Sequence, residues 1–239
     1  MYFKNTKLII ITFIIFIGLI SIFYTNAIYS MNVTNHKAKA GEDKDIVIVV
    51  DPGHGGIDGG AVSISGMMEK DVNLKISLKL RDKLQQLGYK VILTRESDNG
   101  LYTDEGTIRK KKIEDLNNRT KIKKDSNCDM FISIHLNMFP ESKYYGAQVW
   151  YSRNKDSEKL AKLIQDNFKS DLDSTNNRKE KPALDSYKVL RSVDNMPSVL
   201  VECGFLSNPM EEKKLKSNYY QDKIVDSIAK SVSMYYSKE

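Results

Sequence analysis

Cysteine is scarce in this chain, which has only Cys128 and Cys203 among its 239 residues. Two cysteines cannot build the disulfide framework of a small secreted domain, and they form no CxxC pair that would bind a metal. A single bridge is conceivable in an oxidising compartment. We expect instead two separate cysteines, each buried as a small hydrophobic side chain.

A strong excess of charge of one sign is also absent. Charged residues make up 28% of the chain and the net charge is +6, which is too balanced for an intrinsically disordered protein. A positive charge favours polyanions such as nucleic acid, anionic membranes or acidic wall polymers. Because Lys and Arg are spread along the chain without an aromatic-basic stacking pattern, we expect a solvated surface and no nucleic-acid binding.

The N-terminal segment is the part that indicates a compartment. Lys4 and Lys7 precede an uncharged apolar run, Leu8–Tyr24, which is typical of an export signal. The run is long for the core of a cleaved signal peptide and slightly short for a membrane span. Residues 1–29 are therefore either a signal peptide, with a cut after Ala27, or a membrane anchor. In both cases the remainder of the chain is expected to face outward.

A polar linker is expected at residues 30–45 and a single domain at residues 46–239. The β-branched run Ile46–Val50 predicts a buried strand, and apolar residues at helical spacing in Glu69–Leu87 predict a helix that Gly88 ends. Further strands are expected at Lys90–Thr94, Met130–His135, Ala147–Tyr151, Lys188–Arg191 and Ser198–Val201. Further helices are expected near Lys112–Lys124, near Ser157–Lys169 and beyond Pro209. A long polar loop is expected at Asp171–Lys181. This alternation predicts an α/β fold with a central mixed, largely parallel sheet flanked by helices.

Two of the three histidines stand at the ends of expected strands. His54 follows the first strand in the segment DPGHGG, and His135 closes the segment FISIH. Functional sites of α/β sheets assemble at the carboxyl ends of strands. Imidazole is a common zinc ligand, and a catalytic zinc ion takes three protein ligands and keeps one position open. Because His36 lies in the linker, the third ligand must be a carboxylate.

Glu69 is the best-placed carboxylate, because it opens the first helix after the glycine-rich loop. Simpler explanations exist for each residue: a histidine at a strand end is often only hydrogen-bonded, and a glutamate at a helix start favours the helix dipole. The co-location of His54, Glu69 and His135 favours a metal site. Phosphate binding by the loop is the weaker alternative, because the loop lacks the GxxxxGK[ST] pattern and has histidine at its centre.

A fourth candidate, Glu202, ends the apolar strand Ser198–Val201. A carboxylate at the end of a buried strand is unfavourable unless it is solvated, paired or used. Zinc hydrolases need such a general acid/base to take a proton from water and return it to the leaving amine. Cys203 could be proposed as a nucleophile instead. It is one residue out of phase with Glu202, so on a strand it would face the opposite side of the sheet.

Five motifs then carry a family resemblance. They are DPGHGGIDGGA from Asp51, EKDVNL from Glu69, Thr94-Arg95, SIHLN from Ser133 and VECGFLSNP from Val201. In this order and spacing, from about Ile46 to the C-terminus, the chain resembles the zinc-dependent N-acetylmuramoyl-L-alanine amidases, the Amidase_3 family. The resemblance implies an α/β catalytic domain, a Zn²⁺ cofactor and a peptidoglycan substrate, cut at the amide that joins muramic acid to L-alanine.

Position by position, the resemblance places the zinc ligands at His54, Glu69 and His135 and the catalytic glutamate at Glu202. Arg95 and Asn137 also match motif positions, with structural or substrate-side roles. Two alternatives stay open: a catalytically silent wall-binding or scaffold protein, and a zinc peptidase that cuts another peptidoglycan bond.

Two departures from the family concern its regulation. Many relatives append wall-binding repeats, whereas we expect only a leader, a linker and a catalytic domain here, as in the small sporulation amidases that prepare spore cortex. Some relatives also insert a helix that plugs the site after the second histidine, but only a short loop separates Asn137 from Gly146. Control is therefore expected from expression, location, weak metal occupancy or an activating protein partner. The exported domain would be secreted or membrane-anchored and face the cell wall or spore cortex.

Overall fold

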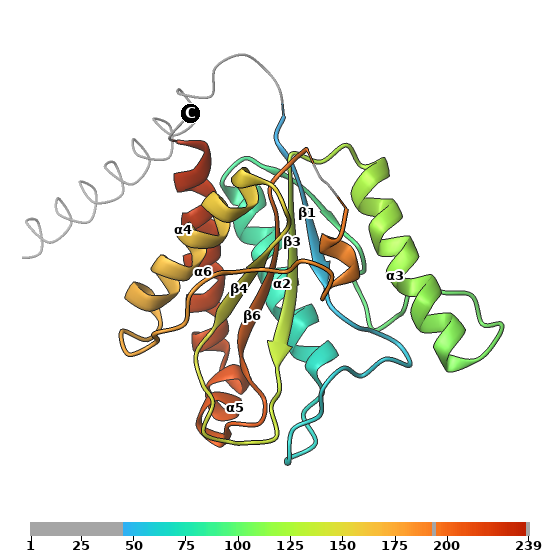
Figure 1. Cartoon of the computed structure of the whole chain (residues 1–239), viewed down its shortest axis with the longest axis horizontal. Helices are drawn as coiled ribbons and strands as arrows, with labels where there is room; N and C mark the ends of the chain where they lie inside the picture. The colour runs from blue at the N-terminus through green and yellow to red at the C-terminus, as the bar shows by residue number, and fades with distance from the viewer. Residues whose placement is uncertain (1–44, 193–194, 238–239) are drawn as a thin grey trace, which may run out of the picture. The chain divides into compact units, whose positions relative to one another are not determined.

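A six-stranded sheet forms the centre of the protein. The computed structural model describes residues 45–192 and 195–237, which form an α/β domain (Figure 1). Its strands are β1 (Val47–Pro52), β2 (Lys90–Leu93), β3 (Met130–Asn137), β4 (Gln148–Tyr151), β5 (Lys181–Pro182) and β6 (Ser198–Phe205). They lie in the order β2-β1-β3-β6-β4-β5. Among the strand pairings of the described residues, that of β4 with β6 alone is antiparallel, so the predicted mixed, largely parallel sheet is confirmed.

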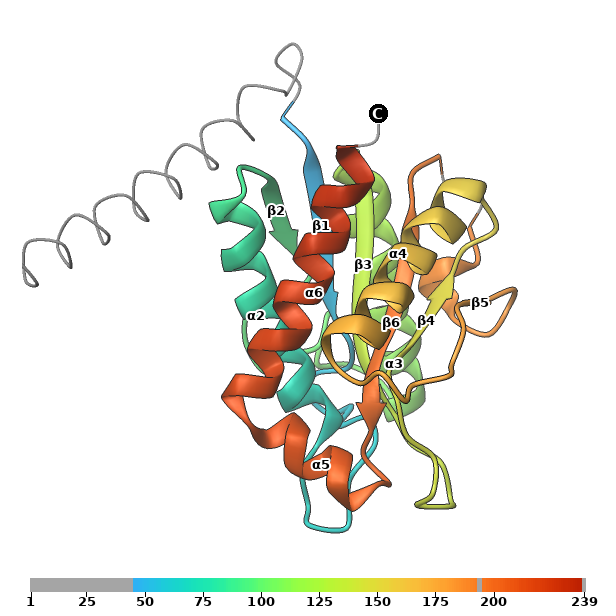
Figure 2. The same ribbon diagram turned by 90° about the vertical axis from the view of Figure 1, so that its left-hand side faces the viewer.

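Helices cover both faces of this sheet. They are α2 (Glu69–Gln86), α3 (Ile108–Asp125), α4 (Lys155–Asp171), α5 (Pro209–Lys216) and α6 (Asn218–Tyr236). α2, α4 and α6 lie together on one face, and α3 lies on the other with the short 3-10 helix η1 (Lys188–Leu190) (Figures 1 and 2). The sheet flanked by helices therefore agrees with the predicted α/β class.

Alternation along the strands divides the core into two parts. Ile48 and Val50 of β1 point into a large apolar cluster with α2, α4 and α6, whereas Val49 points into a smaller cluster on the α3 side. The same period of two continues along β3 and β6. Toward the carboxyl ends of the strands, the residues on the α3 side become polar. They are Asp51, Ser133, His135 and Glu202.

One predicted strand is wrong. In place of the predicted strand Lys188–Arg191 the chain forms the single turn η1 (Lys188–Leu190), and Val189 and Leu190 are both buried there. Two adjacent apolar residues in so short a run fit one turn of helix as well as a strand. The predicted polar loop after α4 ends in the two-residue strand β5, and the C-terminal helical region divides into α5 and α6.

The predicted state of the cysteines is confirmed. Cys128 and Cys203 are both buried free thiols, and they lie in different apolar clusters. The predicted leader at residues 1–29 and most of the predicted linker lie outside the described residues. Between residues 45 and 192 and between 195 and 237, no helix is long and apolar enough to cross a membrane.

Candidate metal site

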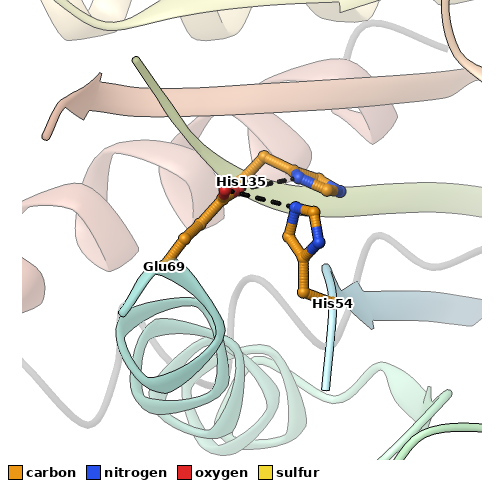
Figure 3. Close-up of side chains that lie close together, drawn as sticks. All are labelled: His54, Glu69 and His135. Carbon is orange, nitrogen blue, oxygen red and sulfur yellow. Dashed lines mark hydrogen bonds and ion pairs between the residues drawn. The ribbon is translucent and has the colours of Figure 1, made fainter. Parts of the chain in front are cut away.

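Three predicted side chains meet at the carboxyl edge of the sheet. His54 follows β1, His135 lies near the end of β3, and Glu69 is the first residue of α2 (Figure 3). Each offers a ligand atom, and these atoms lie within 4.8 Å of one another. The Glu69 carboxylate lies between the two rings, with Oε2 3.2 Å from His54 Nε2 and Oε1 3.0 Å from His135 Nδ1. Two imidazoles and one carboxylate at this spacing can hold a metal ion.

The glycine-rich loop allows this close approach. A Cβ atom on Gly53 would lie 2.3 Å from the His135 ring, so a larger residue cannot occupy that position. At Gly60, with φ +67°, a Cβ atom would meet both Glu69 and the His54 ring. His54 itself has a φ of 61°, a backbone conformation that is unusual for any residue except glycine. The loop is therefore shaped around these three side chains.

Glu69 is the most firmly held of the three. Beside the two histidines, its carboxylate accepts hydrogen bonds from the backbone N–H groups of Ala61 (2.9 Å) and Leu136 (3.0 Å) and from the Asn73 amide (3.3 Å). Burial alone would raise the pKa of Glu69, but its contacts with His135 and His54 hold the pKa well below its usual range. The side chain is thus fixed as a carboxylate.

His54 is oriented from its other nitrogen. Its Nδ1 lies 2.8 Å from Asp58 Oδ2, and Lys112 Nζ lies 2.8 Å from the second oxygen of that carboxylate. Burial opposes the charged imidazole, but the hydrogen bonds and charges of Asp58 and Glu69 outweigh it and raise the pKa of His54 to about 9. A carboxylate on the far nitrogen of a metal-binding histidine fixes the ring and its tautomer. Asp58 therefore leaves Nε2 for the cluster.

A buried ion pair that sequence reasoning missed lies beneath the loop. Arg119 of α3 is 2% exposed and donates to Asp51 Oδ1 (2.6 Å), to the Pro52 carbonyl (2.8 Å) and to the His54 carbonyl (2.6 Å). Asp51 also accepts hydrogen bonds from Thr94 and Ser133. Burial opposes the Asp51 charge, but Arg119 and these hydroxyl groups hold its pKa below the usual value. Arg119 therefore anchors the backbone that carries His54.

Arg95 and Asn137 have different positions. Arg95 is 3% exposed and donates to the backbone carbonyls of Pro52, Gly53 and Lys70. It is therefore a structural residue of the loop. Asn137 lines the cavity at the site, which agrees with a place on the substrate side.

Glu202 lies on β6 opposite His135 of β3. Oε1 accepts a hydrogen bond from the Tyr187 hydroxyl (3.2 Å), and the buried Oε2 has no hydrogen-bond partner among the described residues. Burial is the main reason that the pKa of Glu202 rises to about 7. This carboxylate can therefore take up and release a proton near neutral pH.

A cavity of about 420 Å³ joins these groups. His54, Glu69, His135 and Glu202 all line it. Cys203 lies in the apolar cluster on the opposite face of the sheet, so the expected alternation is confirmed and the cysteine is not available as a nucleophile in this cavity. Metal ligands and a proton-transferring carboxylate at the strand ends of an α/β sheet define a metal-dependent hydrolase.

Comparison with known proteins gives the particular family. The family model described as N-acetylmuramoyl-L-alanine amidase (Amidase_3) matches residues 48–234, and the chain belongs to this family.

Individual relatives agree with this assignment. The chain is 43% identical over 196 residues to the germination-specific N-acetylmuramoyl-L-alanine amidase of Bacillus subtilis, which covers 81% of each chain. It is similar to a solved structure of the CwlD amidase from Clostridioides difficile in complex with the GerS lipoprotein. That match has 48% identity and a TM-score of 0.79, and it covers 82% of this chain and 100% of that one. An N-acetylmuramoyl-L-alanine amidase from Clostridium difficile 630 matches with 32% identity and a TM-score of 0.70, over 82% of this chain and 100% of that one.

Proposed function

We propose that this protein is a zinc-dependent N-acetylmuramoyl-L-alanine amidase that hydrolyses the amide between muramic acid and L-alanine in peptidoglycan. The observation that carries the proposal is the cluster of His54, Glu69 and His135, which opens into the cavity that Glu202 lines. Membership in the amidase family supports the bond that is cut.

Zinc fits the ligand set. Two imidazole nitrogens and one carboxylate are the ligands that catalytic zinc sites use, and Asp58 supplies the outer carboxylate that such histidines usually have. A zinc ion held by His54, Glu69 and His135 would polarise the amide carbonyl and lower the pKa of a water molecule.

Glu202 supplies the proton transfer. Its carboxylate takes the proton from the attacking water and delivers it to the nitrogen of L-alanine, because an amine leaves poorly without a proton. A pKa of about 7 suits both steps, since the group must accept a proton and then release it. Glu69, by contrast, stays charged because backbone N–H groups donate to both of its oxygens, and it would serve as a metal ligand and not as a proton carrier.

We further propose a location and a biological setting. The leader at residues 1–29 would export the chain, cleaved or retained as an anchor, and residues 30–45 would link it to a catalytic domain at 46–239, facing the cell wall or spore cortex. The similarity to the germination-specific amidase and to the CwlD amidase supports spore cortex as the substrate. An activating protein partner is consistent with the CwlD amidase having been solved with the GerS lipoprotein.

Product analysis tests the proposed function. Zinc-loaded protein, incubated with peptidoglycan from vegetative cells and from spores, should release stem peptides with a free L-alanine amine, detected by mass spectrometry. The Glu202→Gln variant, matched for folding and zinc content, should release almost none. Cleavage at another bond would identify a zinc peptidase, and equal product from the wild type and the variant would contradict the role of Glu202. No cleavage, together with tight binding to the wall, would favour a silent scaffold protein.

A further inference from the structure

The two oxygens of Glu202 have different surroundings. The side chain is 6% exposed, and Tyr187 is the single hydrogen-bond donor to it among the described residues. That donor engages Oε1, while Oε2 is buried without a partner. A carboxylate that is held at one oxygen has a defined plane, and its second oxygen is left to exchange a proton.

Tyr187 is itself held in place from three directions. Its ring packs edge-on against Trp150 of β4, with centroids 5.5 Å apart and planes at 61°. Its carbonyl accepts the hydrogen bond from the Leu190 N–H (3.0 Å) that closes η1. It also packs against the apolar cluster on the α3 side of the sheet. The hydroxyl is therefore presented by a rigid support rather than by a loose loop.

The hydroxyl also stays protonated. Burial, followed by the charge of Glu202, raises the pKa of Tyr187. Near neutral pH the group is thus a hydrogen-bond donor to the carboxylate. A hydrogen bond to a charged carboxylate is stronger than one between neutral groups.

We propose that Tyr187 is a positioning residue of the amidase reaction: it holds Glu202 through Oε1 and so assigns the proton transfer to Oε2. This inference rests on the proposed function. It differs from a role in which the Tyr187 hydroxyl contacts the substrate, which is the competing explanation because Tyr187 also lines the cavity.

The Tyr187→Phe variant tests the proposal, because it keeps the ring and its contact with Trp150 and removes only the hydroxyl. We expect kcat to fall about 10–100-fold, the size expected for loss of a hydrogen bond to a charged group, while KM, zinc content and melting temperature stay unchanged. Tyr151→Phe is the matched control. The Tyr151 hydroxyl donates to Glu158 at the surface (3.4 Å), so kcat and KM should keep their wild-type values.

A second measurement separates the two roles of the hydroxyl. In the Glu202→Gln background, calorimetry would give the Kd for an N-acetylmuramoyl dipeptide with and without Tyr187→Phe. Equal Kd values are expected if Tyr187 acts through Glu202. A larger Kd when Tyr187→Phe is added to Glu202→Gln would overturn the proposal. So would a raised KM or an unchanged kcat in the Tyr187→Phe single variant. If the wild type itself released no stem peptide, the proposed function would fail instead.

Discussion

The two faces of the central strands carry the same backbone but contrasting side chains. Toward α2, α4 and α6 the strands present an unbroken apolar surface, whereas toward α3 they change from apolar to charged within a few residues of their carboxyl ends. The first face buries apolar side chains in the main core, and the second carries the side chains of the metal site and its cavity. The side chains of the catalytic cavity therefore lie on one side of the sheet, and a substitution on the opposite, apolar side should change stability without changing activity.

Within the polar side, two buried glutamates repeat the contrast on a smaller scale. Glu69 has donors at both oxygens and a pKa held well below the usual range. Among the described residues Glu202 has one donor, at Oε1, and none at Oε2, and its pKa is about 7. Burial raises the pKa of both glutamates, but at Glu69 the hydrogen bonds and charges of the two histidines outweigh it, whereas at Glu202 burial remains the main effect.

The largest expected effect comes from exchanging these two carboxylates for amides. Glu202→Gln should lower kcat by about 10²–10⁴-fold, as for loss of a general acid/base, and should keep its zinc. Glu69→Gln should lose both zinc and activity, because the charged ligand is gone. Zinc content by atomic absorption, measured beside kcat, checks this. Loss of zinc from Glu202→Gln would show that the two glutamates do not have separate roles.

The next effect concerns the ion pair under the metal loop. Arg119→Met leaves Asp51 buried without its cation, and we expect the free energy of unfolding to fall by about 3–5 kcal/mol in urea denaturation. The double variant Asp51→Asn, Arg119→Met removes both charges and should recover part of this loss. Equal stabilities of the single and double variants would mean that the uncompensated charge is not the cause.

A substitution on the apolar face should change stability alone. Ile164 of α4 is fully buried, so Ile164→Ala should lower the free energy of unfolding by about 2–5 kcal/mol. Well below its melting temperature, the variant should keep the kcat and KM of the wild type. A lowered kcat in fully folded, zinc-loaded protein would show that the two faces are energetically coupled.

The last effect, and the smallest for each unit of pH, is the pH dependence of metal binding. The pKa of His54 is raised from 6.5 to about 9 in the metal-free protein, so the stabilisation from its charged form is full below pH 6.5 and is lost as the pH rises through 9. Zinc needs the neutral imidazole. Its affinity should therefore rise with pH over this range, by at most about tenfold per unit from this residue. Competition with a chromophoric chelator measures the slope.

Asp58→Asn provides the matched variant for that measurement. Without the carboxylate, the pKa of His54 should fall, so the pH dependence should level off at a lower pH. Zinc affinity above that pH should also be about 10–100-fold weaker, because the ring is less well oriented. An unchanged pH slope in the variant would argue against Asp58 as the group that raises the pKa of His54.

The pattern of strands and helices in the sequence was sufficient to predict the fold class and the meeting of the two histidines at one sheet edge. The apolar runs mark where the strands end. Because the two strands are parallel, His54 after the first and His135 at the end of the other lie at the same edge of the sheet. Glu69 needed the family resemblance, because many carboxylates begin helices and only the folded loop shows which one faces the histidines.

Other parts could not be predicted because their partners are distant in sequence. α3 buries Arg119 and Lys123 where most helices bury apolar residues, so its pattern does not reveal its inner face. Tyr187 stands directly before η1, which contacts β6, and its hydroxyl reaches Glu202 from there. Nothing in the local sequence indicates that contact.

The burial of Cys203 has a practical consequence. This thiol lies one residue from Glu202 and is fully enclosed by the apolar face. A thiol-directed reagent can label it only when β6 separates from the helices that cover this face, α4 and α5 among them. The labelling rate of Cys203 thus reports the rate of local opening of β6, the strand that carries Glu202. A comparison of this rate with and without zinc would show how far a metal ion bound at the edge of the sheet slows the local opening of the strand.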